Sequence, residues 1–113
     1  MMPAQLKPIY FLGGRIKTPP FSEAARKEAG RLLFELQRGH SLGMPKSKPL
    51  PLLGSRSHEL RVRDVGHNWR IVYRIDPKVI LVFSIFSKTG RAHQQREFAE
   101  VKRRMKRYDE DHE

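Results

Sequence analysis

The stretch "HELRVRDVGHNWRIVYR", residues 58–74, decides the fold, because apolar and charged side chains alternate along two short runs in it. The first run covers residues 58–64 and the second covers residues 68–75. The apolar members are Leu60, Val62, Trp69, Ile71 and Tyr73, and the cations between them are Arg61, Arg63, Arg70 and Arg74. A period of two is typical of strands that bury one face. The stretch therefore predicts a β-hairpin with one apolar face and one cationic face.

The alternation also predicts how the two strands pair. A four-residue turn from Val65 to Asn68, which includes His67, unites the apolar residues on one face. The expected pairs are Arg63 with Arg70, Val62 with Ile71, Leu60 with Tyr73 and Glu59 with Arg74. A slip of one residue would set arginines against aromatic side chains, so the pattern favours this register. Glu59 and Arg74 would form a structural ion pair, whereas Arg63 opposite Arg70 would cost up to about 1 kcal/mol.

The remaining segments complete an α+β fold. Ser22 is the expected N-cap of the first helix, and apolar residues then recur at helical spacing from Ala25 to Leu36. The expected elements are a strand within 7–14, this helix up to Gly39, a packed loop over 39–57, a central strand over 79–86, a helix over 92–108 and a frayed acidic tail over 109–113. The prediction is one domain, residues 1–113, with a small antiparallel sheet of about four strands against one or two N-terminal helices and a C-terminal helix.

Charge is the strongest functional signal in the composition. The 113 residues hold 23 Lys and Arg against 12 Asp and Glu, a net charge of +11. Such an excess repels itself in the compact state and favours an anionic partner, above all nucleic acid. The chain has no cysteine, which excludes disulfides and thiolate metal sites. It also shows no signal peptide or membrane-spanning run, so we expect a cytoplasmic protein without a membrane partner.

Three motifs in this order give the chain a family resemblance. The segments "ELRVRD" (59–64), "WRIVYR" (69–74) and "FSKTGR" (86–91), followed by a basic final helix, resemble the RelE/ParE toxin superfamily and most of all its HigB-like, phage-related branch. The resemblance covers residues 7 to about 108. It implies a RelE-like fold and a type II toxin that acts as an mRNA endoribonuclease on the ribosome and inhibits translation.

The resemblance also implies partners and site residues. It implies no metal and no cofactor, neutralisation by a cognate antitoxin that is a small helix-turn-helix protein, and contact with operator DNA only through that antitoxin. The resemblance places Arg61, Arg63, Arg70, Lys88 and Arg91 at its cationic site positions, and the chemistry of the residues adds His67, His93, Lys102 and Arg103. The candidate catalytic residues are therefore Arg63, Arg70, Lys88 and His93, and the candidate RNA-binding residues are Arg61, Arg91, His67, Lys102 and Arg103. Where many ribosome-dependent members have a tyrosine in the C-terminal region, this chain has Gln94, Gln95 and Phe98.

These residue types suit metal-independent RNA cleavage. The reaction needs a base for the 2′-hydroxyl, an acid for the departing 5′-oxygen and cations for the charge on the phosphate oxygens. Guanidinium groups bind a phosphate through two N–H donors each. His93, at the start of the final helix, is the candidate for proton transfer.

Two rival functions and a plainer interpretation stay open from the sequence. One rival is a ParE-like toxin that inhibits DNA gyrase with the same fold and no ribonuclease chemistry. The other is a non-catalytic nucleic-acid-binding module. The plainer interpretation is that the arginines and the run from Lys102 to Arg107 are solvated surface charge.

Overall fold

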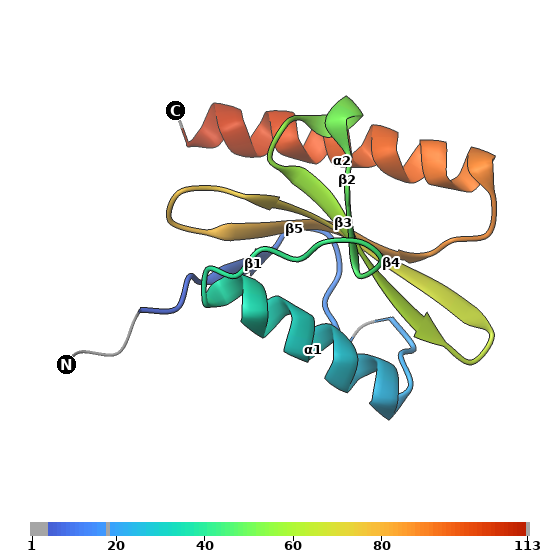
Figure 1. Cartoon of the computed structure of the whole chain (residues 1–113). Helices are drawn as coiled ribbons and strands as arrows, with labels where there is room; N and C mark the ends of the chain where they lie inside the picture. Colours follow the sequence, from blue (N-terminus) through green and yellow to red (C-terminus); the bar gives the residue numbers. More distant parts are fainter. Residues whose placement is uncertain (1–4, 18, 113) are drawn as a thin grey trace.

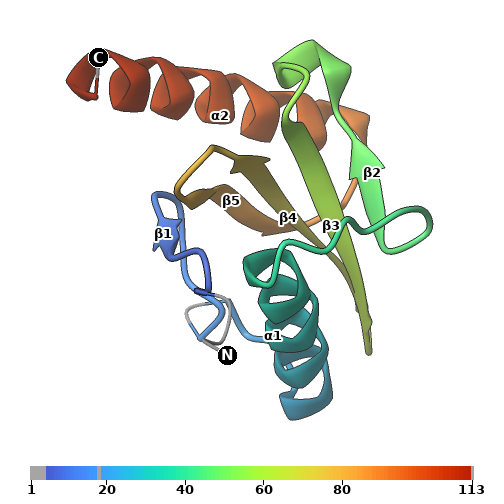
Figure 2. The ribbon, with the colours of Figure 1, turned by 60° about the vertical axis from the view of Figure 1, so that its left-hand side comes forward.

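The fold is a five-stranded sheet between two helices, seen in a computed structural model that describes residues 5–17 and 19–112 (Figure 1). Helix α1 lies against one face of the sheet, and the longer α2 crosses the other face in both views (Figures 1 and 2). This is the predicted α+β class. The elements are β1 (Ile9–Phe11), α1 (Glu23–Gln37), β2 (Ser47–Pro49), a 3-10 turn (Pro51–Leu53), β3 (Ser57–Asp64), β4 (His67–Ile75), β5 (Ile80–Ser87) and α2 (Arg91–Asp111).

The strand order is β1-β5-β4-β3-β2, with β5 buried between two neighbours as predicted. Strand β1 runs parallel to β5, and the other neighbouring pairs are antiparallel. The expectation of about four antiparallel strands is therefore corrected in two respects. One strand is parallel, and the segment 39–57 is not wholly a loop, because it supplies the edge strand β2. Proline is tolerated at such an edge, and Pro49 concealed this strand in the sequence.

The hairpin pairs β3 and β4 two residues away from the predicted register. Arg61 lies opposite Arg70, Leu60 opposite Ile71, and Glu59 opposite Val72. The turn consists of Val65 and Gly66 alone, and Gly66 has a φ of 75°, a conformation that favours glycine. A two-residue shift keeps every side chain on its predicted face. The predicted faces are therefore right, while the predicted cross-strand pairs are wrong.

The apolar face of the hairpin packs against α1. Ser22 caps the helix, because its Oγ accepts the N–H of Ala25 at 3.1 Å. The buried helix residues are those of the predicted stripe, Ala25, Ala29, Leu32, Leu33 and Leu36, and they contact Leu60, Val62, Trp69, Ile71 and Tyr73 of the hairpin. Asp64 ties the two elements together, since its Oδ2 accepts the backbone N–H of Ser22 at 2.9 Å and the indole N–H of Trp69 at 3.2 Å.

The opposite face of the sheet packs against α2. Val101 and Met105 are buried there, while Phe98 and Tyr108 lie at the margin of the same cluster. The C-terminal tail departs from expectation, because residues 109–111 continue α2 instead of fraying. Asp109 holds the helix end to the sheet through Arg74, as described below. Glu113 of the predicted tail lies outside the described residues.

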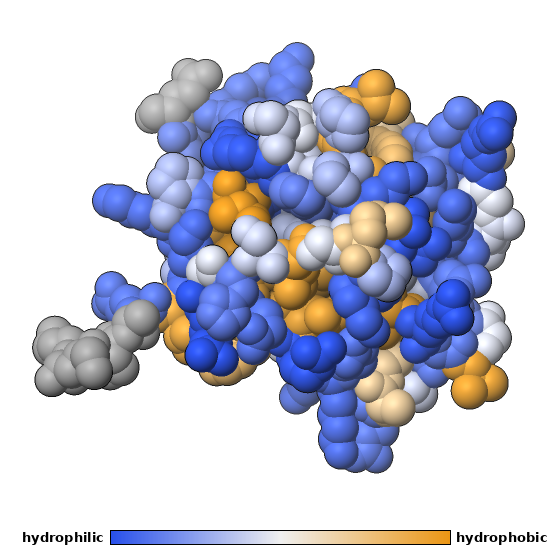
Figure 3. All heavy atoms as spheres, in the orientation of Figure 1, coloured by the Kyte–Doolittle hydropathy of each residue, from blue (hydrophilic) through white to orange (hydrophobic). Residues whose placement is uncertain are grey.

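Hydrophilic side chains cover most of the face seen in Figure 3, and the hydrophobic patches on it are small and separate. Within residues 5–17 and 19–112, no helix has both the length and the apolar character needed to cross a membrane.

Candidate functional site

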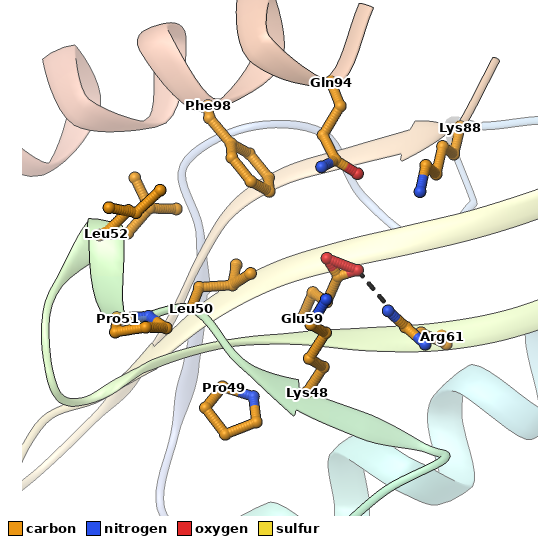
Figure 4. A pocket seen from close by; sticks show the side chains of 11 residues that line it. Lys48, Pro49, Leu50, Pro51, Leu52, Glu59, Arg61, Lys88, Gln94 and Phe98 are labelled. Atoms are coloured by element: carbon orange, nitrogen blue, oxygen red, sulfur yellow. Dashed lines mark ion pairs between the residues drawn. The ribbon is translucent and has the colours of Figure 1, made fainter. Parts of the chain in front are cut away.

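Two cavities adjoin at the cationic face of β3 and β4, and Arg61 lines both of them. The leucine-rich cavity, about 240 Å³, lies between β2, the 3-10 turn and the first turns of α2 (Figure 4). The arginine-rich cavity, about 290 Å³, lies beside the part of β3 that extends beyond β2. The leucine-rich cavity is lined by Lys48, Pro49, Leu50, Pro51, Leu52, Leu53, Glu59, Arg61, Lys88, Gln94 and Phe98. The arginine-rich cavity is lined by Glu28, Pro45, Lys46, Arg61, Val62, Arg63, Asn68 and Arg70.

A buried carboxylate lies between two arginines at the junction of the cavities. Glu59 is only 2% exposed, and its Oε2 is 3.1 Å from Nε of Arg70 and 3.6 Å from Nε of Arg61. These contacts lack hydrogen-bond geometry, and none of the three atoms has a hydrogen-bond partner in the described part of the chain. A buried polar atom without a partner costs about 1–3 kcal/mol. The cluster thus keeps a net positive charge, with two guanidinium groups for one carboxylate, and it has unused donors and an unused acceptor.

Burial controls the electrostatics of this cluster. It lowers the pKa of Arg70, while Glu59 acts to raise that pKa and Arg61 to lower it. Guanidinium groups titrate so far above neutrality that Arg70 still carries its charge at pH 7. An anion that entered beside Arg61 and Arg70 would therefore relieve the repulsion between them.

In the observed register Arg63 and Arg70 no longer lie directly opposite each other, as was predicted. Arg61 is the residue opposite Arg70, and Arg63 lies opposite Asn68. All four line the arginine-rich cavity, so the predicted cations do share one wall. Asn68 was predicted in the turn, and it instead belongs to β4.

Arg74 is separated from these arginines and has a structural role. Its side chain is 7% exposed and makes paired hydrogen bonds of 2.8–3.1 Å to the carboxylates of Asp76 and Asp109. Burial opposes its charged form most strongly, yet the hydrogen bonds that Arg74 donates to both aspartates, together with their negative charge, outweigh burial and raise the pKa of Arg74. The predicted Glu59–Arg74 ion pair is therefore wrong, because α2 brings Asp109 to Arg74 and Glu59 pairs with the other two arginines.

The two cations of the basic turn after β5 have different surroundings: Lys88 lies at the leucine-rich cavity and Arg91 lies in the solvent. Lys88 lines the leucine-rich cavity, and its backbone N–H donates to the carbonyl of Asn68 at 2.9 Å. Arg91 is exposed at the start of α2 and lines neither cavity. Lys102 and Arg103 are likewise exposed on α2 outside both cavities, and Arg103 bonds to Glu100.

His93 lies apart from the two cavities. Its Nδ1 is 3.0 Å from the hydroxyl of Thr89, and its Nε2 is 3.8 Å from Glu97. Its ring meets Phe86 edge to face, with 5.5 Å between centroids. A helix turns by about 100° per residue, so the next residue, Gln94, reaches the leucine-rich cavity while His93 does not.

His67 also lies away from the arginines. It was predicted in the turn but begins β4, where its Nδ1 is 3.0 Å from the hydroxyl of Ser87. Its ring stacks on Trp69 at 4.9 Å. Alternation along β4 places His67 and Trp69 on the α1 face, opposite Arg70.

Sequence reasoning missed five polar residues of the cavities: Glu28, Lys46, Lys48, Glu59 and Gln94. Glu59 alternates with Arg61 and Arg63 and so carried a signal, since a lone acid on a cationic strand face is unusual. Gln94 had a weak positional signal, because it is one of three residues, with Gln95 and Phe98, in the region where the resemblance implies a tyrosine. Lys46 and Lys48 had none, since their loop held an unrecognised strand.

The site as a whole offers cations, the carboxylates of Glu28 and Glu59, and the amides of Asn68 and Gln94 around two open cavities. In the described part of the chain, no three His, Asp or Glu side chains are grouped as metal ligands. Cations on a concave wall bind phosphate, and a carboxylate among them can accept a proton. Fold and site together define a small basic α+β domain with a concave wall of cations.

Comparison with known families places the chain more closely. Residues 20–106 match the family model described as Phage derived protein Gp49-like (DUF891), and the chain therefore belongs to this family. The family is RelE/ParE-like and is associated with the toxins of toxin-antitoxin systems, which implies a cognate antitoxin. No curated protein and no solved structure matches the chain.

Proposed function

We propose that this protein is a HigB-like type II toxin that cleaves mRNA on the ribosome and so inhibits translation, without a metal or cofactor. One observation carries the proposal: Glu59 lies buried between the half-buried Arg61 and Arg70 at the junction of two open cavities, and their facing atoms have no hydrogen-bond partner in the described part of the chain. A phosphodiester next to a ribose hydroxyl supplies acceptors for the two guanidinium groups and a donor for the carboxylate.

The proposed chemistry is transesterification. Glu59 accepts the proton of the 2′-hydroxyl, whose oxygen attacks the adjacent phosphorus, and the bond from phosphorus to the 5′-oxygen breaks. The products are a 2′,3′-cyclic phosphate and a 5′-hydroxyl, and Lys88 donates the proton to the departing oxygen. Arg61, Arg63 and Arg70 stabilise the charge on the phosphate oxygens, an effect worth roughly 100- to 1,000-fold in rate per lost donor.

The other expected site residues take outer roles in this proposal. Arg91, Lys102 and Arg103 bind RNA backbone outside the cavities, where their charges are exposed. His67 and His93 are left without a direct role, because each lies away from the cluster. The proposed partners are the ribosome with its mRNA and a small helix-turn-helix antitoxin, through which alone the toxin would meet operator DNA.

The decisive experiment compares variants in a coupled translation reaction and maps cuts in a reporter mRNA by primer extension. We expect codon-related cuts from the wild type and losses of roughly 100-fold or more for Arg70→Ala and Glu59→Gln. Arg26→Ala, which removes an exposed cation of α1 outside both cavities, is the matched control and should cut as the wild type does. Circular dichroism establishes that each variant is folded.

Two outcomes would contradict the proposal. Equal cleavage by Arg70→Ala and the wild type would show that the assigned cluster is not the active site. Inhibition of gyrase supercoiling by the wild type, with reporter mRNA left intact, would identify a ParE-like toxin instead.

A further inference from the structure

We infer that the leucine-rich cavity is a nucleobase subsite and that Gln94 is the residue that distinguishes one base from another. The inference rests on the proposed function, because it assigns a part of the RNA substrate to a cavity of the proposed active site. It goes beyond that function by stating where a base next to the cleaved bond would bind and what would recognise it.

The cavity has an apolar end suited to the face of a base. The apolar residues are Pro49, Leu50, Pro51, Leu52 and Leu53 from the β2 side and Phe98 from α2. Figure 4 shows the Phe98 ring and the leucines on opposite sides of the opening. Leu52 is 85% exposed, so this large apolar side chain is available for contact. Aromatic and apolar walls of this kind bind the faces of unstacked bases.

The other end of the cavity is polar and charged. Glu59, Arg61 and Lys88 lie there, and Lys48 adds a further cation. A nucleotide has the same asymmetry, with an apolar base face at one end and a phosphate at the other. If the base of a nucleotide bound between Phe98 and the leucines, the phosphate of that nucleotide would lie at Arg61. Arg61 belongs to the cluster with Glu59 and Arg70 at which cleavage is proposed.

Gln94 stands between the two ends. Its side chain extends from the first turns of α2 into the cavity, between Phe98 and Lys88 (Figure 4). Its backbone N–H donates to the carbonyl of Gly90 at 3.0 Å, and this helical hydrogen bond fixes the position of the Gln94 backbone. The amide offers a donor and an acceptor side by side, the arrangement with which Asn and Gln read a base edge. The cavity volume of about 240 Å³ accommodates one base.

The first test measures binding separately from cleavage. The full chain is titrated with each of the four ribonucleoside 5′-monophosphates and with ribose 5-phosphate, and binding is followed by NMR chemical shifts. We expect at least one nucleotide to bind about tenfold more tightly than ribose 5-phosphate, as stacking of one base provides. Gln94→Ala should reduce the differences among the four nucleotides, and Gln95→Ala, a neighbouring exposed glutamine, should leave them unchanged.

The second test maps cleavage positions in a reporter mRNA for the same variants. We expect Gln94→Ala to change the base preference beside the cut while Gln95→Ala retains it. The inference fails if ribose 5-phosphate binds as well as every nucleotide, or if Gln94→Ala and the wild type cut the same bases with the same preference. Base-selective binding by a wild type that cuts no mRNA would support the subsite and reject the nuclease.

Discussion

At the scale of single residues, the arginines of the hairpin divide into two kinds that look alike in the sequence. Arg61 and Arg70 share one carboxylate and lie at open cavities, whereas Arg74 is buried beneath α2 between two carboxylates. The Cζ atom of Arg74 also lies 5.4 Å from the centroid of the Phe83 ring and 5.9 Å from the centroid of the Tyr108 ring. The first kind is available to a substrate, and the second fixes the fold.

Replacing Arg74 should therefore destabilise the protein without altering the cavities. Arg74→Met leaves Asp76 without its main partner and releases the end of α2, so we expect a loss of about 3 kcal/mol in the free energy of unfolding. Chemical denaturation measures this loss. Lys78→Met, which removes an exposed cation, is the control, and equal stability of the two variants would contradict the structural role.

Asp64 should make stability depend on pH in the acid range. The hydrogen bond from the backbone N–H of Ser22, helped by those from Val65 and Trp69, lowers the pKa of Asp64 to about 2. Asp64 thus binds a proton less readily in the folded protein than in the unfolded chain. Its carboxylate therefore stabilises the fold fully above about pH 4. That contribution is lost as the pH falls from about 4 to 2. Denaturation curves of Asp64→Asn over this range should lack this step, and an unchanged step would disprove its assignment to Asp64.

At the scale of elements, the short strand β2 completes the leucine-rich cavity and needs its own anchor. Ser47 at its start is buried, and its hydroxyl is 2.7 Å from the hydroxyl of Tyr73 in β4. Lys48 and Pro49 of this strand line the cavity. The hydroxyl pair therefore connects the core of the sheet to one wall of the candidate site.

Removing that hydroxyl should loosen β2. Tyr73→Phe leaves the Ser47 hydroxyl buried without its partner, and we expect a loss of about 1–2 kcal/mol in stability together with faster amide exchange in residues 47–49. Tyr10→Phe is the matched control, because Tyr10 is 52% exposed. Identical exchange in the two variants would mean that β2 is held by its backbone pairing with β3 alone.

At the scale of the whole molecule, the cations of the two cavities should govern affinity for RNA. Six cationic side chains line them: Lys46, Lys48, Arg61, Arg63, Arg70 and Lys88. If all six contact phosphates, the logarithm of affinity for single-stranded RNA should fall with the logarithm of salt concentration at a slope of roughly −4. Fluorescence anisotropy at several salt concentrations measures this slope. A slope near zero would remove the electrostatic basis of the interface. A slope of roughly −6 is expected if the three proposed outer contacts, Arg91, Lys102 and Arg103, also form on free RNA.

The local pattern was sufficient to predict the helices, the strands other than β2, and their faces. Apolar spacing identified the buried stripe of α1, and alternation separated the apolar from the cationic face of the hairpin. It could not fix the cross-strand partners, because a shift of two residues preserves both faces and only the turn distinguishes the registers. The prediction therefore placed Arg63 opposite Arg70, whereas Arg61 occupies that position in the structure.

The sequence by itself determined that this chain has an apolar core beneath a cationic sheet, because the periods of strands and helices are local properties of the chain. Only the tertiary structure decided which cations are available, since Asp109 reaches Arg74 across 35 residues and β2 closes one cavity from within an apparent loop. It also decided that Gln94, and not His93, enters the leucine-rich cavity. Contacts between distant segments depend on how the elements pack, and no local period encodes that packing.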